Sequence, residues 1–154
     1  MTYWVWVFAE IQALRWVVDS STMAFPESAG SRIAAMAKGD QVVLYTTRGA
    51  FHNPTRDEAR LVGIATVEED PERRSPPLEI AGREFVYACR VSIDILLPER
   101  TGASVRELAS DLDLVAKPAS WGAYFRQPPV RIGERDFNQM RVAVESLAEL
   151  EGRA

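Results

Sequence analysis

The segment from Tyr45 to Asp57 gathers the side chains of this chain that are best suited to contact a ligand. Its sequence, YTTRGAFHNPTRD, contains aromatic residues, the only histidine, an amide and two arginines. Aromatic rings stack on flat ligands, and imidazole, amide and guanidinium groups form hydrogen bonds with polar edges. The segment therefore indicates binding of a flat polar ligand rather than catalysis. The residues expected to make these contacts are Tyr45, Thr46, Arg48, Phe51, His52, Asn53 and Arg56.

Catalytic chemistry has little support in the sequence. Acid–base and nucleophilic catalysis most often use histidine, but His52 stands beside Asn53 and Pro54 without an evident partner. A solvent-exposed or turn-stabilising role is as consistent with the sequence as contact with a ligand. Cys89 falls on the apolar face of a long strand, which indicates packing. We expect no catalytic residue, and an enzyme that uses His52 as acid or base is the third of three hypotheses.

Metal and cofactor sites are also unexpected. One histidine and one cysteine cannot supply the spacing of a zinc site. The chain lacks the glycine-rich motifs that hold phosphates in P-loops and dinucleotide-binding folds. We therefore expect no metal and no cofactor.

Length and charge restrict the class of protein. The chain has 154 residues and a formal net charge of -4, which predicts one domain over residues 1–154 and no general attraction to polyanions. Its beginning lacks a signal sequence, no apolar run approaches the length of a membrane span, and a single cysteine fits a reducing compartment. We expect a cytoplasmic protein with no membrane partner.

Basic residues are nevertheless concentrated in places. The range 117–135 contains four basic residues and one acidic residue, and Arg48 and Arg56 add to this charge. Aromatic residues, among them Phe51, Trp121 and Tyr124, lie near these positions in the sequence. Basic and aromatic side chains together are typical of surfaces that bind single-stranded or flipped-out bases. Ordinary solubilising charge and core aromatics are the alternative explanation.

The elements that position these residues form a mixed pattern. The range 3–9 alternates with apolar residues on both faces, which predicts a central strand. Strands over 41–47 and 60–68 flank the 45–57 segment, which is long for a hairpin loop and therefore suggests a functional role. The other expected elements are helices over 10–18, 26–38 and 105–112, a surface excursion over 70–77, strands over 78–80, 83–97, 124–126 and 130–132, and a closing helix from Asp136. We predict an α+β fold: a mixed, curved sheet or small β-barrel with short outer helices.

Four motifs in this order resemble the EVE domain of the PUA-like superfamily, a relative of the YTH domain. They are the aromatic first strand YWVW, the MAKGD run at 36–40, the strand pair VLYTT and VGIA, and the segment FRQ…VRI…DF near the end. The resemblance spans nearly the whole chain. It implies a PUA-like small β-barrel with outer helices and a pocket for a modified base: modified cytosine has been proposed for EVE proteins, and N6-methyladenosine is the ligand of YTH proteins.

Two pocket motifs of that family are absent. The W-x-G-V-R-N motif of EVE proteins is replaced by STMAFP at 21–26, and the Ser-Glu-Pro after the first strand by FAE at 8–10. We therefore expect a divergent member whose pocket walls differ. The residues expected to build its walls and rim, besides those of the 45–57 segment, are Trp4, Trp6, Met23, Phe25, Trp121 and Arg126.

The preferred function is non-catalytic recognition of a modified base or nucleotide in nucleic acid, either DNA or RNA. Aromatic walls would stack on the base, Thr46, His52 or Asn53 would read its edge, and Arg48, Arg56 and Arg126 would hold flanking phosphates. The second hypothesis is a protein-interaction module in which exposed aromatics form a homodimer interface.

Overall fold

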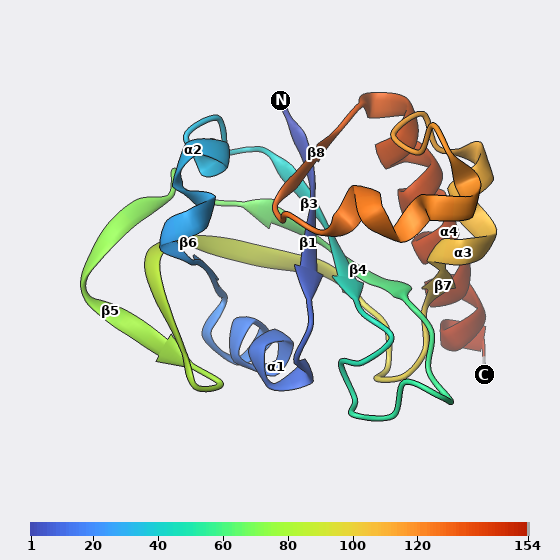
Figure 1. Cartoon of the computed structure of the whole chain (residues 1–154), viewed down its shortest axis with the longest axis horizontal. Helices are drawn as coiled ribbons and strands as arrows, with labels where there is room; N and C mark the ends of the chain where they lie inside the picture. The colour runs from blue at the N-terminus through green and yellow to red at the C-terminus, as the bar shows by residue number, and fades with distance from the viewer. Residues whose placement is uncertain (154) are drawn as a thin grey trace.

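A mixed, strongly curved β-sheet organises the protein (Figure 1). The computed structural model describes the backbone of residues 1–153 and the side chains of residues 1–151. The strands are β1 Tyr3–Phe8, β2 Thr22–Phe25, β3 Gln41–Thr46, β4 Arg60–Val67, β5 Glu72–Ile80, β6 Arg83–Leu96, β7 Ala103–Ser104 and β8 Val130–Ile132. The main order is β2-β6-β4-β3-β1-β8, with β5 paired to β6 and β7 paired to β4. Only β1 and β3 are parallel, so the predicted mixed, curved sheet is confirmed.

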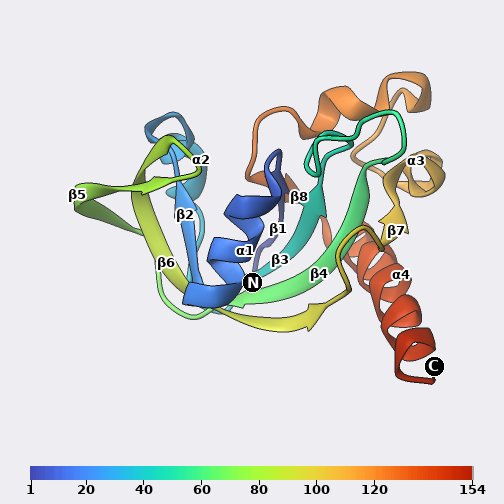
Figure 2. The same cartoon turned by 90° about the horizontal axis from the view of Figure 1, so that it is seen from below.

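Helices cover both faces of this sheet. They are α1 Ile11–Ser20, η1 Glu27–Ala29, α2 Gly30–Ile33, α3 Val105–Leu108, η2 Ala109–Asp111, η3 Pro118–Phe125 and α4 Glu134–Arg153. Figure 2 shows that α1 lies inside the curve of the sheet, whereas α4 runs along its outer side. No helix in the described range is long and apolar enough to cross a membrane.

Alternation along β1 builds two cores, one on each face. Trp4, Trp6 and Phe8 face the concave side and pack in one cluster with α1. Val5 faces the opposite side and packs in a second cluster with Phe137 of α4. Because both faces are apolar, β1 needs neighbours on both edges, and it lies between β3 and β8. The prediction of a central first strand is confirmed.

The curvature brings the two ends of the sheet together. Trp6 of β1 meets Phe25 of β2 edge to face, with ring centroids 4.8 Å apart and planes at 75°. Gly63 in β4 permits the paired strand β6 to approach closely beside a register shift, because a Cβ atom there would lie 2.4 Å from the carbonyl oxygen of Ile95. β8 pairs with residues 3–5 only, so from Trp6 onward no strand within residues 1–153 pairs with the edge of β1 that faces away from β3. That free edge is where a cavity forms.

A buried carboxylate fastens the start of β1. Asp40, which is 3% exposed, accepts hydrogen bonds from the backbone N–H groups of Thr2 and Ala37 and from Nε1 of Trp4, at 2.9, 2.9 and 3.1 Å. Since a buried charge is tolerated only when it is well hydrogen-bonded, these donors fix the turn before β3 against β1. Trp4 is thereby committed to the core.

Asp40→Ala should lower the free energy of unfolding by about 2–3 kcal/mol, because it leaves buried donors without an acceptor. Asp40→Asn, which keeps one acceptor oxygen, should be intermediate. Urea unfolding followed by tryptophan fluorescence measures the difference. Asp19→Ala on the exposed surface of α1 is the control and should stay within about 0.5 kcal/mol of the wild type. Equal stabilities for the two alanine variants would contradict this account of Asp40.

One local prediction was wrong, and one strand was not predicted. The proline-containing range 70–77 belongs largely to strand β5, not to a surface excursion. Pro76 and Pro77 lie where the pairing with β6 shifts register between Arg73 and Leu78, so an exposed edge strand accommodates both prolines. The range 21–26 contains strand β2, which the sequence did not predict, because its partner β6 lies more than 60 residues away.

Two further elements also differ from expectation. Residues 124–126 are not a strand, because Pro118–Phe125 forms 3-10 turns that end at Arg126. The predicted helix over 26–38 is reduced to a 3-10 turn and the single turn of α2. After α2 the carboxylate of Asp40 accepts a hydrogen bond from the N–H of Ala37, which stabilises a turn in place of a longer helix. The capped helix starting at Val105 is confirmed at its beginning, where Ser104 Oγ accepts from the N–H of Glu107, but it changes to 3-10 geometry after Leu108.

Candidate functional site

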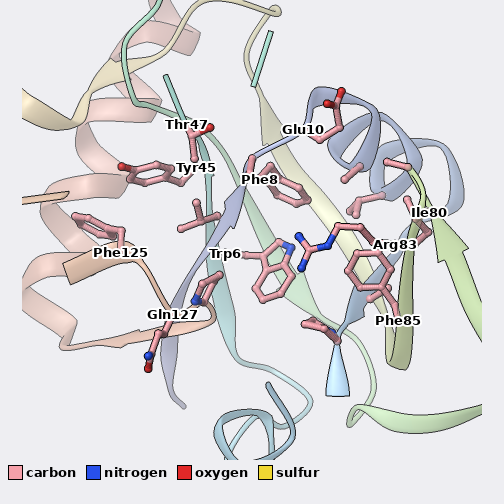
Figure 3. Close-up of a pocket in the computed structure, with 18 of the residues that line it drawn as sticks. Trp6, Phe8, Glu10, Tyr45, Thr47, Ile80, Arg83, Phe85, Phe125 and Gln127 are labelled. Carbon is pink, nitrogen blue, oxygen red and sulfur yellow. The ribbon is translucent and has the colours of Figure 1, made fainter. Parts of the chain in front are cut away.

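A cavity of about 720 Å³ opens at the free edge of β1 (Figure 3). Its walls come from six parts of the chain: β1 and the residues after it, helix α1, the range 24–32 from β2 to α2, β3 and the residue after it, the β5–β6 hairpin, and the range 122–128, which runs from the end of η3 towards β8. The volume lies in the range of small-molecule and cofactor sites. Because the sheet curves back on itself, segments distant in sequence meet around one space.

Aromatic side chains form much of the lining. Trp6 and Phe8 come from β1, Phe85 from β6, and Tyr45 and Phe125 lie across the cavity from Phe85. Trp6 is held by edge contacts with Phe8 and Phe25, at centroid distances of 6.3 and 4.8 Å. Tyr45 and Phe125 pack at 5.0 Å. Burial raises the pKa of Tyr45 to about 12, so its hydroxyl is neutral at physiological pH.

Three arginines also line the cavity: Arg32 of α2, Arg83 at the start of β6, and Arg126 after η3. Within residues 1–151, none of them has a carboxylate within 4.0 Å. Arg32 donates from Nη2 to the carbonyl oxygen of Pro128 at 2.9 Å, but its buried Nε finds no acceptor in this part of the chain. A buried donor without an acceptor destabilises a fold by about 1–3 kcal/mol, so the unsatisfied Nε of Arg32 carries a free-energy penalty.

Glu10 is the one acidic residue among those that line the cavity. Its carboxylate lies 2.9 Å from Nε2 of His52 and accepts a weak hydrogen bond from the backbone N–H of Gln12 at 3.4 Å, at the start of α1. Desolvation raises the pKa of Glu10, but the hydrogen bonds from His52 and Gln12 outweigh it and lower the pKa below its ordinary value. Glu10 is therefore ionised at neutral pH.

His52 consequently has a partner that the sequence did not reveal. Glu10 lies 42 residues away and meets His52 only because α1 and the 45–57 loop are brought together, as the hydrogen bond from Ile11 N to Ala50 O shows. The imidazole is largely exposed, at 70%, and the backbone of His52 has a positive φ of 64°. The pairing supports a role for His52 in holding the loop against α1.

The predicted site residues are divided among several places. Trp6, Tyr45 and Arg126 line the cavity. Trp4, Met23 and Phe25 lie in the core behind it, at 2%, 0% and 0% exposure. Trp121 packs on the outer core. The residues of the loop that lie outside the cavity, exposed or partly exposed, are Arg48, His52, Asn53 and Arg56.

Thr46 and Phe51 line a second, smaller hollow of about 260 Å³ beneath α1. The guanidinium of Arg100 lies 5.4 Å from the centroid of the Phe51 ring and donates to Asp57 at 2.9 Å. Asp57 also accepts from Arg60 at 3.2 Å. The end of the loop is thus fastened by ion pairs around a buried carboxylate.

Cavity residues that the sequence did not indicate include Phe8, Arg32, Arg83 and Phe85. The predicted strands over 78–80 and 83–97 are close enough in the sequence to form a hairpin, but nothing in the local sequence showed that Arg83 would face the first strand. Among residues 1–151, no group of His, Cys, Asp and Glu side chains is arranged to hold a metal ion.

The curved sheet, with α1 inside its curve and α4 and shorter helices outside, is a YTH-like fold. No protein-family model and no curated protein sequence matches this chain. The similarity lies in solved structures instead. The crystal structure of the Mmi1 YTH domain complex with RNA has a TM-score of 0.66 and 13% identity, covering 97% of this chain and 81% of that chain.

Two other solved structures extend the comparison. The Pho92 YTH domain in complex with m6A has a TM-score of 0.60 and 12% identity, over 93% of this chain and 83% of that one. The NMR structure of Rpa0253 from Rhodopseudomonas palustris has a TM-score of 0.60 and 16% identity, over 96% and 95%. At these identities the likeness concerns the fold alone, and the resemblance to the EVE family stays a prediction.

Arg100→Gln should raise the pKa of Asp57, because the hydrogen bond from Arg100 is the main influence that lowers it. A carboxyl group whose pKa is lowered by folding stabilises the fold above its unfolded-state pKa, and this contribution is lost as pH falls through the lowered value. The variant should therefore be less stable than the wild type at neutral pH, and the difference should narrow as the pH falls through the lowered pKa of Asp57.

Urea unfolding from neutral to acidic pH measures the difference in stability between the variant and the wild type. Arg106→Gln is the control, because it removes an exposed arginine that does not pair with Asp57. A stability difference that does not change with pH would contradict the assignment to Asp57.

Proposed function

We propose that this protein binds nucleic acid and holds one base, turned out of the strand, in the cavity beside Trp6, without chemical change. The observation that carries the proposal is the combination in one cavity of aromatic walls and three arginines without carboxylate partners in the described range. Aromatic rings stack on the face of a base and arginines bind phosphate, so the cavity has side chains suited to both the base and the phosphate of a nucleotide.

The fold supports the same proposal. Domains of this fold have been solved in complex with RNA, in the case of Mmi1, and in complex with m6A, in the case of Pho92. The cavity here opens at the edge of the curved sheet, a surface position that a base extruded from a strand can reach.

We propose further that the base is modified. Between the aromatic rings the cavity is lined by small and aliphatic side chains, including Ala13 and Ile80. A methyl group buried against such a surface contributes about 0.8 kcal/mol, a several-fold preference over the unmodified base. The exposed Arg48 and Arg56 on the 45–57 loop, and Arg126 at the cavity, are placed in this proposal against flanking phosphates.

Ala13→Phe should weaken binding of single-stranded oligonucleotides about 5- to 150-fold, because a ring on this face of α1 occupies the space in which a base would stack. The substitution removes no core contact of Trp6. Isothermal titration with RNA and DNA oligomers that contain N6-methyladenine or 5-methylcytosine measures the loss, with unmodified oligomers beside them.

Gln12→Phe is the matched control. It adds the same ring to the neighbouring, exposed position of α1, which does not line the cavity. Equal effects of the two variants would exclude the cavity as the binding site. Binding of all oligomers with equal affinity, abolished by salt, would reject recognition of a base.

Phe51→Ala tests the earlier prediction that the loop forms a wall of the site. Since Phe51 lines the smaller hollow, binding through the cavity predicts little change in affinity. A large loss in Phe51→Ala with none in Ala13→Phe would move the site to the loop. The alternative of a homodimerisation module stays a prediction, which sedimentation at high concentration would test.

A further inference from the structure

Arg32, Arg83 and Arg126 reach the same cavity from three separate parts of the chain. Arg32 comes from α2, Arg83 from the turn of the β5–β6 hairpin, and Arg126 from the segment before β8. We propose that they form an anion subsite for the phosphate of the same nucleotide whose base lies beside Trp6. The ligand class is then a nucleoside monophosphate, either free or as the terminal residue of a strand. This inference rests on the proposed function of the cavity.

Charge balance is the first argument. Outside the cavity, six arginines of the described range are paired with a carboxylate, among them Arg15 with Glu99, Arg73 with Glu27, and Arg135 with Asp113, at 2.6, 3.0 and 2.9 Å. The six of that range that are not paired are all exposed to solvent and line no part of the cavity. The three cavity arginines have no such partner among residues 1–151. The one acidic residue at the cavity, Glu10, is already paired with His52. A positively charged space with an apolar floor favours an anionic ligand that also carries an apolar or aromatic part.

The second argument is the hydrogen bonding of Arg32. Its Nη2 is engaged by the carbonyl oxygen of Pro128, which fixes the guanidinium across the end of the cavity. Its Nε is buried and has no acceptor in the described part of the chain. A phosphate oxygen is the kind of acceptor that a guanidinium binds best, because the bond is charge-assisted. Because Nε is buried, a phosphate in the cavity can accept from it only after the side chain turns, and it would then supply the acceptor that Nε lacks among residues 1–151.

The third argument is the position of Arg83. Its side chain is exposed, and its guanidinium points into the cavity next to the indole of Trp6 and 6.0 Å from the centroid of the Phe85 ring (Figure 3). A base that stacks on Trp6 must displace this guanidinium or stack against it. Either movement keeps Arg83 beside the nucleotide, where a phosphate on the same sugar can pair with it.

Size supports a whole nucleotide. A space of about 720 Å³ is in the range that encloses drug-sized ligands, which comprise more atoms than a single base. Base, sugar and phosphate can therefore share it. An internal residue of a strand is linked to chain at both its 5′ and its 3′ side, a terminal residue at one side only, and a free nucleotide at neither.

The test compares nucleosides with their monophosphates at constant ionic strength. Titrations use N6-methyladenosine and 5-methylcytidine, each as nucleoside and as 5′-monophosphate, with inorganic phosphate as a competitor. We expect each monophosphate to bind about tenfold or more tightly than its nucleoside. Arg83→Gln should reduce this ratio towards one, whatever its effect on the affinity for the nucleoside, because only the monophosphate loses a partner for its charge. Because Arg83 is exposed, the variant should remain folded, which a thermal melt verifies.

Arg74→Gln is the matched control, since it removes the same charge from an exposed position of the same hairpin outside the cavity. It should keep the wild-type ratio. Equal affinities for nucleoside and monophosphate in the wild type would overturn the anion subsite, as would an equal loss of the ratio in Arg74→Gln.

Oligonucleotides separate this inference from the proposed function. Strands with the modified residue at a phosphorylated 5′ end, compared with strands that carry it internally, distinguish a terminal from an internal residue. Tight binding of internal residues, with no gain from the terminal phosphate, would overturn the subsite while the proposed function stands. Failure of all oligonucleotides and monophosphates to bind would reject the proposed function itself.

Discussion

The contact between Trp6 and Phe25 is the constraint on which the rest of the structure depends. The two residues belong to strands that are separated by β6, β4 and β3 in the sheet order, so the rings can meet only if the sheet curves through much of a circle. The same contact places Trp6 at the edge of a cavity instead of in the middle of a flat sheet. One side chain thus belongs both to the concave core and to the wall of the candidate site.

Charge is distributed unevenly in this acidic protein. Ion pairs neutralise many exposed arginines, and Asp57 alone engages Arg60 and Arg100. At the cavity the balance is reversed, with three arginines and one glutamate that is itself paired. A net charge of -4 therefore says little about the local potential that a ligand would meet.

Much of the fold could be predicted because its signals are local. Two apolar faces identified β1 as a central strand, and the long helix α4 followed from its apolar spacing. The candidate site was less predictable, because Trp4 and Trp6 occupy equivalent positions in the alternation of β1. The hydrogen bond to Asp40 holds Trp4 in the core, whereas the contact with Phe25 places Trp6 at the cavity. The position of Arg83 at the cavity and the pairing of His52 with Glu10 depend on contacts between segments that are distant in sequence, so no local sequence pattern predicts them.

The unusual edge strand β5 has a consequence for solubility. It pairs with β6 alone, so its other edge offers hydrogen-bonding groups on which a second molecule could add a strand. Pro76 and Pro77 interrupt that row of donors, and the charges of Glu72, Arg73 and Arg74 separate neighbouring molecules. The exposed edge is thereby protected against edge-to-edge aggregation. The tip of the hairpin stays on the body of the protein, because Ile80 and Phe85 pack against Ala13 and Trp16 of α1, and this packing holds Arg83 at the cavity.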